Sequence, residues 1–406
     1  MHLKILHIVL VNRWYPPLSN GGIAVYNFYL ARALVKLGHH VTVIAARWSA
    51  EKPAYSVDEG VKIHRLLMHH YTGVHRLPIM GRYMRGLQQM QYSFQVAHKL
   101  YELEQADRPD VIEFAEVNAE GWAYLRQKKH VPVIVRCHTP TFVLREYYDT
   151  VEMPFDTKLT TRLEKNCIHQ ANVLSAPSCD MAQTIAQHID RINVRDFCVI
   201  PNTLDTTQFA VDDRSYARQP ITVLHVGRLD RAKGIETLAR AIPQVVERYP
   251  DVNFVYVGGD RPDGEGSTWQ KRLNSYFEQQ QVQRNIVFTG NIDHNELLAW
   301  YKRADIAVVP SMLYESFSYT VAQAMAAGLP VIASRIGGIP ETLQNGQYGL
   351  LTAVGDVNNL VEELCKLIEQ QSLRQTLGTA ASQYARQEFA PEVVAQQTLD
   401  LYRSIL

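Results

Sequence analysis

The sequence predicts an α/β protein of two domains, each built on a doubly wound parallel sheet. Its 406 residues exceed an ordinary domain of about 100–200 residues. Short β-branched runs alternate along the chain with longer segments of helical period. This alternation is typical of parallel sheets covered by helices on both faces. The 46% of hydrophobic residues is ordinary for a globular chain, so neither disorder nor a repeat scaffold is expected.

The expected strands fall into two series separated by an irregular stretch. The first comprises residues 5–11, 41–45, 111–114, 133–137, 172–176 and 198–200, and the second 221–226, 253–257, 286–289, 306–309 and 331–333. Residues 206–220 are polar and aperiodic, which places the boundary near Pro201-Asn202-Thr203-Leu204-Asp205. We therefore expect a first domain over 1–203 and a second over 204–390, with a cleft between them. An amphipathic helix over 391–406 opens at Pro391 and should join the first domain.

Composition excludes several classes of protein. Lys+Arg and Asp+Glu both total 41, so no nucleic-acid partner is expected. The five cysteines lack any C-x-x-C pair, which argues against a disulfide framework or a zinc site and favours a reducing cytoplasm. The apolar run over 5–11 is interpreted as a first strand and not as a signal peptide, and no run approaches the roughly 20 apolar residues of a spanning helix.

Residues 75–101 mix basic, aromatic and methionine side chains. They predict either a long helix packed on the first domain or a surface that meets a lipid or sugar acceptor. Peripheral membrane contact is therefore left open, and the oligomeric state is not predicted.

A glycine pair, Gly21-Gly22, follows the first strand and precedes a helical pattern that ends at Gly38. Such a turn lets a bound group approach the backbone, and the helix N-terminus offers unpaired N–H donors. The alternative is a plain tight turn. The pair matches neither the dinucleotide fingerprint nor the P-loop.

A second turn in the strand-to-helix pattern carries cations. The strand over 221–226 ends at Gly227, and Arg228 and Lys233 follow before a helix begins. Cations at the carboxyl end of a parallel strand, beside a helix N-terminus, suit a diphosphate. The alternative is a pair of solvated surface cations.

Glu315 follows the strand over 306–309, which places it at the carboxyl edge of the sheet, where ligands of open α/β sheets bind. A small-residue helix then runs to Gly328. Gln323 is eight residues after Glu315, just over two turns if the helix began at Glu315, so both side chains could face one cleft. For a lone glutamate, a helix cap is the alternative.

This stretch, with Gly337-Gly338-Ile339-Pro340-Glu341 after it, resembles the nucleotide-sugar site of retaining glycosyltransferases of family 4. Members of that family share the two-domain GT-B fold. The glycine pair, Pro201-Asn202, Gly227-Arg228 and Lys233-Gly234 also fall in the family's order and approximate spacing. The resemblance covers nearly the whole chain, although residues 50–110 and 140–165 are not distinctive.

The resemblance implies a role for each matched position. Arg228 and Lys233 would neutralise the donor diphosphate, with Gly21 and Gly22 bordering the diphosphate and the acceptor. Glu315 would contact the transferred sugar, and His138 matches the active-site histidine of the first domain. The remaining matched positions are the loop that would donate backbone N–H groups to the sugar or phosphate, Ser316, Phe317 and Ser318, and the ribose position, Gln323.

Three residues depart from the family's pattern at two places. Gln323 stands where a ribose-binding glutamate is usual, and serines stand in place of the glycines that flank the phenylalanine. An amide can still accept and donate a hydrogen bond, so nucleotide binding is weakened in principle and not excluded. Serine restricts φ more than glycine does, which bears on donor selectivity.

The resemblance implies a retaining hexosyltransferase of family 4 type that needs neither metal nor cofactor. UDP-glucose or a related UDP-sugar is the first expected donor and GDP-mannose the second. The acceptor would be a hydroxyl of a sugar, a lipid-linked glycan or a small polyol. The alternatives are a nucleotide-sugar-binding protein without transferase activity, suggested by Gln323, a GT-B-type epimerase, and a phosphorylase, which would be longer and carry pyridoxal phosphate.

Overall fold

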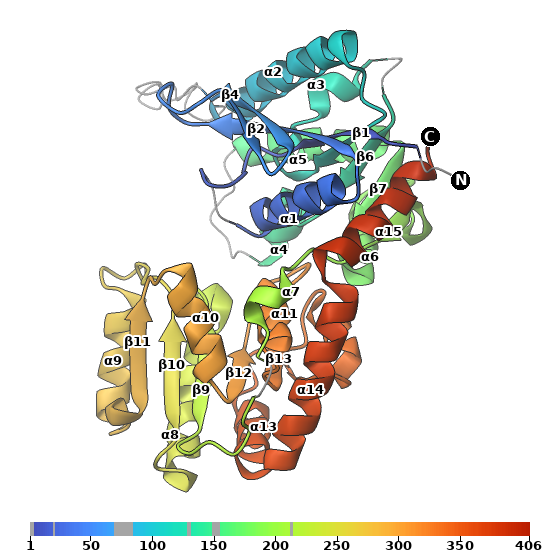
Figure 1. Cartoon of the computed structure of the whole chain (residues 1–406). Helices are drawn as coiled ribbons and strands as arrows, with labels where there is room; N and C mark the ends of the chain where they lie inside the picture. Colours follow the sequence, from blue (N-terminus) through green and yellow to red (C-terminus); the bar gives the residue numbers. More distant parts are fainter. Residues whose placement is uncertain (1–3, 19–20, 69–83, 128–130, 148–154, 212–213) are drawn as a thin grey trace. The chain divides into compact units, whose positions relative to one another are not determined.

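The chain forms two compact units in the computed structural model, which describes residues 4–18, 21–68, 84–127, 131–147, 155–211 and 214–406 (Figure 1). The first unit comprises Met1–Leu204 and Pro391–Leu406, and the second comprises Asp205–Ala390. This boundary lies one residue later than the sequence predicts. Residues 75–83 of the basic and aromatic segment lie outside the described residues.

The described residues of the first unit form an eight-stranded sheet with the strand order β3-β4-β2-β1-β5-β6-β7-β8. Every neighbouring pair is parallel except β3 and β4, which form an antiparallel hairpin at one edge. The purely parallel sheet expected from the sequence is therefore wrong at this edge. The strands are β1 His7–Val11, β2 His40–Arg47, β3 Tyr55–Asp58, β4 Val61–Leu67, β5 Val111–Ala115, β6 Val133–Arg136, β7 Val173–Ala176 and β8 Phe197–Val199.

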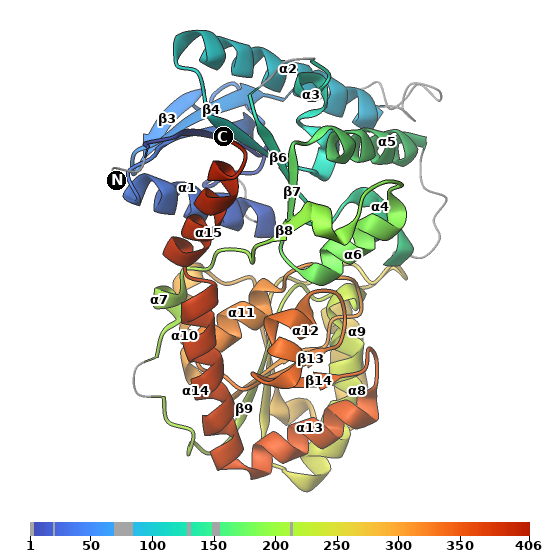
Figure 2. The same cartoon turned by 90° about the vertical axis from the view of Figure 1, so that its right-hand side faces the viewer.

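Helices cover both faces of this sheet, because α1 and α2 lie on opposite sides of it (Figure 1). On one face, side chains of α1 and α15 join those of β1 and β2 in a single core, and Figure 2 shows α15 alongside α1. On the other, α2 packs against α3 and α5. The helices are α1 Gly22–Lys36, α2 Met84–Ala106, α3 Trp122–Leu125, α4 Thr141–Tyr147, α5 Phe155–Gln170, α6 Cys179–His188 and α15 Pro391–Arg403.

The second unit is a six-stranded parallel sheet with the strand order β11-β10-β9-β12-β13-β14. Its strands are β9 Thr222–Val226, β10 Asn253–Val257, β11 Ile286–Gly290, β12 Ile306–Val309, β13 Val331–Ser334 and β14 Leu350–Thr352. The last of these was not predicted. The expected strands over 253–257 and 306–309 have the bounds observed, and the others differ by one or two residues at an end.

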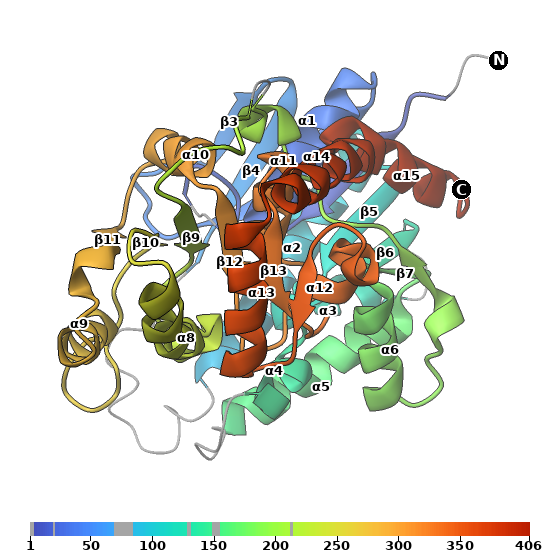
Figure 3. The same cartoon turned by 90° about the horizontal axis from the view of Figure 1, so that it is seen from below.

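The second sheet is also covered on both faces. Figure 3 shows α8 and α13 on one side and α10, α11 and α14 on the other. The apolar face of α8 packs with α9, α13 and the central strands in one core. The helices are α7 Thr206–Phe209, α8 Ile235–Arg248, α9 Trp269–Gln279, α10 His294–Arg303, α11 Tyr319–Ala326, α12 Ile339–Thr342, α13 Val357–Glu369 and α14 Gln371–Glu388.

Each sheet has a point at which the chain reverses its direction of progress across the strands. In the first unit β1 has β2 on one side and β5 on the other, and in the second unit β9 lies between β10 and β12. Loops that leave the carboxyl ends of such strands diverge and open a crevice, which is where open α/β sheets bind ligands.

Candidate active site

The reversal point of the second sheet brings together the loops that follow β9 and β12. Lys233 comes from the first loop and Glu315 from the second, and the ammonium Nζ lies 2.7 Å from Glu315 Oε1. The hydroxyl of Ser311 donates a 2.6 Å hydrogen bond to the same oxygen. The structure therefore joins two residues that the sequence suggested for one site from motifs more than 80 residues apart.

This ion pair is well shielded from water, with 28% of the Lys233 side chain and 14% of the Glu315 side chain exposed. Burial by itself raises the pKa of Glu315, but the ammonium of Lys233 and the hydrogen bonds to the carboxylate outweigh it. The pKa of Glu315 consequently lies below its ordinary value. The site therefore presents a fixed negative charge beside a fixed positive one.

Arg228 and Lys233 leave the same loop toward different partners. The carboxylate of Asp230 accepts a hydrogen bond from the backbone N–H of Lys233 and caps the single 3₁₀ turn Arg231–Lys233. The same aspartate lies 3.1 Å from the guanidinium of Arg228, which is 52% exposed. An ion pair this exposed contributes little to stability, so Arg228 can exchange Asp230 for an anionic ligand at small cost.

Two glycines let the loops of this site pack backbone against backbone. Gly234 has φ +67°, and a Cβ there would lie 1.7 Å from the carbonyl oxygen of Pro310. Gly337 has φ +55°, and a Cβ there would lie 2.4 Å from the carbonyl oxygen of Glu315. The backbone N–H of Gly338 donates a 2.8 Å hydrogen bond to that same carbonyl. The positions of Lys233 and Glu315 are therefore fixed by the main chain around them.

Helix α11 begins at Tyr319, four residues later than the start considered from the sequence. Ser316, Phe317 and Ser318 consequently lie in the loop between β12 and this helix. The ring of Phe317 packs edge-on against Phe389 with centroids 5.4 Å apart, and Ser318 is fully buried. The loop is thus anchored beneath the helix N-terminus, where unpaired backbone N–H groups occur.

Gln323 contacts a partner that the sequence did not suggest. Its Oε1 accepts a 3.0 Å hydrogen bond from the hydroxyl of Tyr301, a fully buried residue of α10. Among the described residues, no hydrogen bond or ion pair joins Gln323 to Glu315. The side-chain carbonyl of Gln323 is therefore engaged inside the unit, and its amide nitrogen is the group left for a ligand.

The glycine pair of the first unit lies where the sequence predicts it, at the start of α1. Gly21 is the N-cap residue, with extended backbone, and α1 begins at Gly22. A Cβ at Gly21 would meet no atom of the described residues within 4 Å. Glycine is therefore not needed there for the packing of the unit, and open space borders the backbone.

His138 follows β6 at the carboxyl edge of the first sheet and is 4% exposed. Its backbone N–H donates a 2.8 Å hydrogen bond to Glu116 Oε2, and its ring packs edge-on against Tyr26 with centroids 5.3 Å apart. Burial, with a smaller contribution from Arg136, holds the pKa of His138 well below its usual value. The imidazole is therefore neutral at physiological pH.

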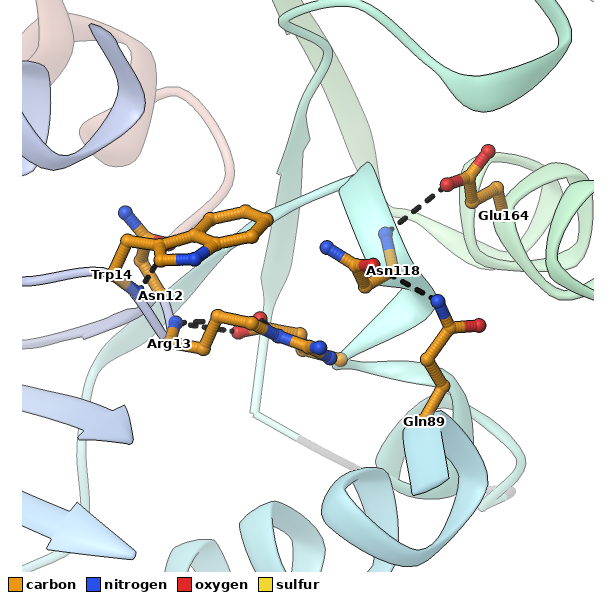
Figure 4. Close-up of polar contacts among 7 residues, drawn as sticks. Asn12, Arg13, Trp14, Gln89, Asn118 and Glu164 are labelled. Carbon is orange, nitrogen blue, oxygen red and sulfur yellow. Dashed lines mark hydrogen bonds and ion pairs between the residues drawn. The ribbon is translucent and has the colours of Figure 1, made fainter. Parts of the chain in front are cut away.

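A group of buried acidic side chains around His138 was missed in the sequence. Burial raises the pKa of Glu116 to about 8 and that of Glu164 to about 7. Glu164 accepts a hydrogen bond from the backbone N–H of Asn118 (Figure 4). It accepts two more from the backbone N–H and the hydroxyl of Thr141. No local pattern marks Glu116 in the sequence, because a glutamate directly after a strand is ordinarily exposed, and its burial depends on the neighbouring strands.

Because the pKa values of these carboxyl groups are raised, we expect the free energy of unfolding to fall as pH rises from 6.5 to 8. In this window folded Glu116 retains a proton that its unfolded form, with a pKa near 4.3, has lost, so stability falls by roughly 1 kcal/mol per pH unit. Histidines with lowered pKa act in the opposite sense, but only below about pH 6.5. In urea unfolding, the free energy of unfolding of Glu116→Gln should depend less on pH than that of the parent protein. Glu51→Gln, at an exposed position, should keep the pH dependence of the parent. Equal slopes for Glu116→Gln and the parent would contradict the assignment.

No group of three or more His, Cys, Asp or Glu side chains in the described ranges has an arrangement that could hold a metal ion. Within the same ranges, no helix combines the length and the apolar character that crossing a membrane requires.

Comparison with protein families matches both halves of the chain. Residues 20–208 match the family described as Glycosyltransferase Family 4. Residues 211–384 match the family described as Glycosyl transferases group 1. The two matches meet close to the boundary between the two structural units.

Relatives of known name match over nearly their whole length. The glycogen synthase of Mycobacterium tuberculosis is 26% identical, with 98% of this chain and 94% of the relative covered. The D-inositol 3-phosphate glycosyltransferase of Corynebacterium glutamicum is also 26% identical, with 96% and 93% covered.

Solved structures show the same fold. Sucrose-phosphate synthase from Thermosynechococcus elongatus superposes with a TM-score of 0.78 at 24% identity, covering 98% of this chain and 99% of the other. HepE of Anabaena in complex with UDP-glucose gives 0.71 at 18% identity, covering 98% and 100%. The two family matches, the relatives and the fold agree, and the chain belongs to the family 4-type glycosyltransferases of GT-B fold.

Proposed function

We propose that this protein is a retaining hexosyltransferase that moves a hexose from a nucleotide diphosphate donor to a hydroxyl acceptor without a metal ion. The observation that carries the proposal is the partly buried ion pair of Lys233 and Glu315 at the reversal point of the second sheet. A transferring sugar develops positive charge at its reacting carbon while the leaving diphosphate develops negative charge. The pair offers each of them a charge of the opposite sign, the Glu315 carboxylate to the sugar and the Lys233 ammonium to the diphosphate.

In this proposal Lys233 and Arg228 neutralise the diphosphate, which a metal ion would otherwise do. Lys233 has three N–H donors and uses one on Glu315, so donors remain for a diphosphate oxygen. Arg228, more than half exposed, supplies a second cation from the same loop. Charge-assisted hydrogen bonds from both would stabilise the departing diphosphate. Backbone N–H groups around Ser316, Phe317 and Ser318 would position the sugar or phosphate.

The proposed reaction is a front-face displacement, which the family resemblance implies. The bond between the anomeric carbon and the diphosphate oxygen breaks, and the acceptor oxygen forms its new bond on the same face. The acceptor's proton passes to the departing phosphate oxygen, so no protein base is required. The chain's own contribution is positioning and charge stabilisation. His138, neutral and buried at the edge of the first sheet, is proposed to contact the sugar.

A UDP-hexose is proposed as the donor, with UDP-glucose first. The structure of HepE of Anabaena was solved with UDP-glucose, which supports this choice for a related fold. GDP-mannose is the second candidate. The acceptor is proposed to be a sugar, a lipid-linked glycan or a small polyol, since the names of the relatives include a glycogen synthase and an inositol phosphate glycosyltransferase.

The test is an array of UDP-glucose, UDP-galactose, ADP-glucose and GDP-mannose against sugar, glycolipid and polyol acceptors. Products would be identified by mass, and nuclear magnetic resonance would read the configuration of the new bond. An α-linked product from an α-linked donor, formed equally well in chelator, supports the proposal. Inversion, or loss of activity in chelator, would contradict the mechanism. Nucleotide binding without any product would favour the binding-protein alternative, and an isomerised donor would favour an epimerase.

The departure at Gln323 leads to a prediction on nucleotide affinity. If Gln323 faces the ribose, Gln323→Ala should weaken nucleotide binding by about 0.5–1.5 kcal/mol, the value of a neutral hydrogen bond. Gln323→Glu should tighten binding modestly, because one carboxylate oxygen can accept from Tyr301 and the other from a ribose hydroxyl. Calorimetric titration of the three proteins measures both effects. Indistinguishable affinities would show that position 323 does not touch the ribose.

Tyr301→Phe provides the matched control for this prediction. Tyr301→Phe removes the hydroxyl and frees the amide of Gln323 to turn. Tyr301→Phe should therefore change nucleotide affinity in the parent protein and have no effect in the Gln323→Ala variant. Additive effects of the two substitutions would show that the hydrogen bond between them serves only the packing of α10 on α11.

A further inference from the structure

A buried histidine lies in the second sheet, three residues before Arg228 in the chain. His225 belongs to β9, the strand at the reversal point, and is 1% exposed. Its Nδ1 lies 3.1 Å from the backbone carbonyl oxygen of Val308, in the neighbouring strand β12. A carbonyl oxygen only accepts hydrogen bonds, so Nδ1 carries the proton and Nε2 keeps a lone pair. His225 therefore presents a hydrogen-bond acceptor in a fixed direction.

The Nε2 atom of His225 has no hydrogen-bond partner among the described residues. Burial lowers the pKa of His225 to about 4, so the ring is neutral at physiological pH. A buried polar atom left unpaired costs about 1–3 kcal/mol. An apolar ring in the same place would leave no such acceptor unpaired. Packing alone therefore does not account for a histidine at this position.

The side chain of Lys233 borders the same small space as this nitrogen. A Cβ placed on Gly227 would lie 3.6 Å from His225 Nε2, 3.4 Å from Lys233 Cγ and 3.6 Å from Lys233 Cδ. These are contact distances, so a space about the size of a methyl group separates the imidazole from the stem of the lysine. The ammonium lies two bonds beyond Cδ, and rotation about the side-chain bonds of Lys233 can bring it toward Nε2.

The charged groups near the imidazole indicate which of them can use Nε2. Besides burial, the charges of Lys233, Asp230 and Glu315 act on the pKa of His225. Nε2 is an acceptor, so an ionised carboxylate cannot hydrogen-bond to it, whereas an ammonium can. Lys233 uses one of its three N–H groups on Glu315. Of these three charged groups, Lys233 is therefore the one that can donate to Nε2.

Tyr256 is the other candidate donor. It is in register with His225 on the neighbouring strand β10, and the two rings have centroids 5.6 Å apart. Its hydroxyl also lacks a hydrogen-bond partner among the described residues. The ring of Tyr256 is stacked on Phe288, with centroids 5.0 Å apart and an interplanar angle of 24°, which holds it in the apolar core. The two side chains are thus neighbours without a hydrogen bond between them, and Tyr256→Phe is a suitable control.

We propose that His225 is a positioning residue for Lys233, whose ammonium donates a second hydrogen bond to His225 Nε2 when a nucleoside diphosphate binds. This inference rests on the proposed transferase function. In the free protein the ammonium is paired with Glu315. When the donor sugar contacts Glu315, Lys233 has to turn toward the diphosphate, and an acceptor beside it fixes its direction. A carboxylate in place of His225 would neutralise the cation, whereas a neutral imidazole leaves the full charge to the diphosphate.

Two substitutions separate this role from a structural one, because each keeps one ring nitrogen's function and removes the other. The shorter His225→Asn places an amide N–H near the position of Nδ1, so it keeps the donor to Val308 and loses the acceptor. The longer His225→Gln reaches the position of Nε2 with its amide oxygen, so it keeps the acceptor and loses that donor. A residue that serves only the stability of the sheet would give the opposite ranking.

The measurement is calorimetric titration with UDP and with uridine, or with GDP and guanosine if the array selects GDP-mannose. We expect His225→Asn to weaken binding of the diphosphate about tenfold and to leave binding of the nucleoside unchanged. His225→Gln should keep most of the diphosphate affinity. In the Lys233→Met variant, His225→Asn should have no further effect, because His225 acts through the lysine. Tyr256→Phe should bind the diphosphate as the parent does.

Three results overturn the proposal. They are a diphosphate affinity of His225→Asn equal to that of the parent, a loss that persists in full in the Lys233→Met variant, and an equal loss in Tyr256→Phe. A parent protein that binds none of these nucleotides refutes the proposed function, and this inference with it.

A measurement on the parent protein covers the case in which the variants do not fold. The nitrogen resonance of His225 Nε2, followed by nuclear magnetic resonance, should move toward that of a hydrogen-bonded nitrogen when the diphosphate is added. The nucleoside alone should leave it in place. An unmoved resonance at saturating diphosphate overturns the proposal.

Discussion

Glu315→Gln is expected to lower kcat by about 10²–10³-fold while nucleotide affinity stays within a few fold. The carboxylate of Glu315 is held ionised by Lys233 and Ser311 at the reversal point of the second sheet. Under the proposed function its charge faces the sugar, whose reacting carbon becomes positive in the transition state. Glutamine keeps the size of the side chain and its acceptor oxygen, so Lys233 and Ser311 retain a partner. The substitution therefore removes the charge and little else.

The measurement is steady-state turnover together with calorimetric titration of the nucleotide. Glu236→Gln provides a matched control, because it removes another glutamate of the same unit that pairs with a cation, Arg272 at 3.6 Å. That partly exposed pair is worth little, and kcat should not change. Turnover at the parent rate in Glu315→Gln would show that the carboxylate is there for the stability of the loop.

Most of the fold could be predicted because parallel strands buried on both faces appear as continuous apolar runs. Residues 253–257 and 306–309 are such runs, and each forms the strand expected. The hairpin of β3 and β4 was missed for the opposite reason. β3 alternates exposed and half-buried residues, and β4 alternates buried residues with exposed or half-buried ones. The two strands are joined at Glu59 and Gly60, both with positive φ. β14 has only three residues, too few for a pattern.

The site could be predicted only in part, since sequence shows which residues follow which strand and not where their side chains go. The sequence pattern places Glu315 and Lys233 at the same sheet edge. Their ion pair, however, depends on the close backbone contacts of Gly234 and Gly337. The start of α11 at Tyr319 and the hydrogen bond from Tyr301 to Gln323 depend on packing between helices. These are tertiary contacts, and no local sequence pattern predicts them.

The buried acids of the first unit show the same limit. A glutamate after an apolar strand is ordinary in sequence, and its burial emerges only when β1, β5 and β6 are placed side by side. The raised pKa of Glu116 follows from that burial. Asn12 and Glu116 follow neighbouring strands although more than 100 positions separate them in the chain.

Lys233→Met is expected to lower kcat/KM by roughly 10- to 100-fold, with little change in the binding of the nucleoside without phosphates. A charge-assisted hydrogen bond is worth about 1.5–3 kcal/mol, and about 1.4 kcal/mol is a factor of ten in rate. The substitution also leaves Glu315 partly buried without its cation, so a loss of stability is expected as well. Activity alone therefore does not separate a diphosphate-binding lysine from one that merely neutralises Glu315.

Two further variants make the separation. Lys233→Met combined with Glu315→Gln removes both charges, so stability measured by urea unfolding should recover toward the parent while activity stays low. Arg228→Gln provides the complementary case, because its exposed contact with Asp230 contributes little to folding. It should leave stability unchanged and still lower kcat/KM, as a second cation for the diphosphate would. Equal losses of affinity for uridine and UDP in Lys233→Met and Arg228→Gln would mean that both cations serve the loop, because a residue that binds the diphosphate has no means of sensing the nucleoside alone.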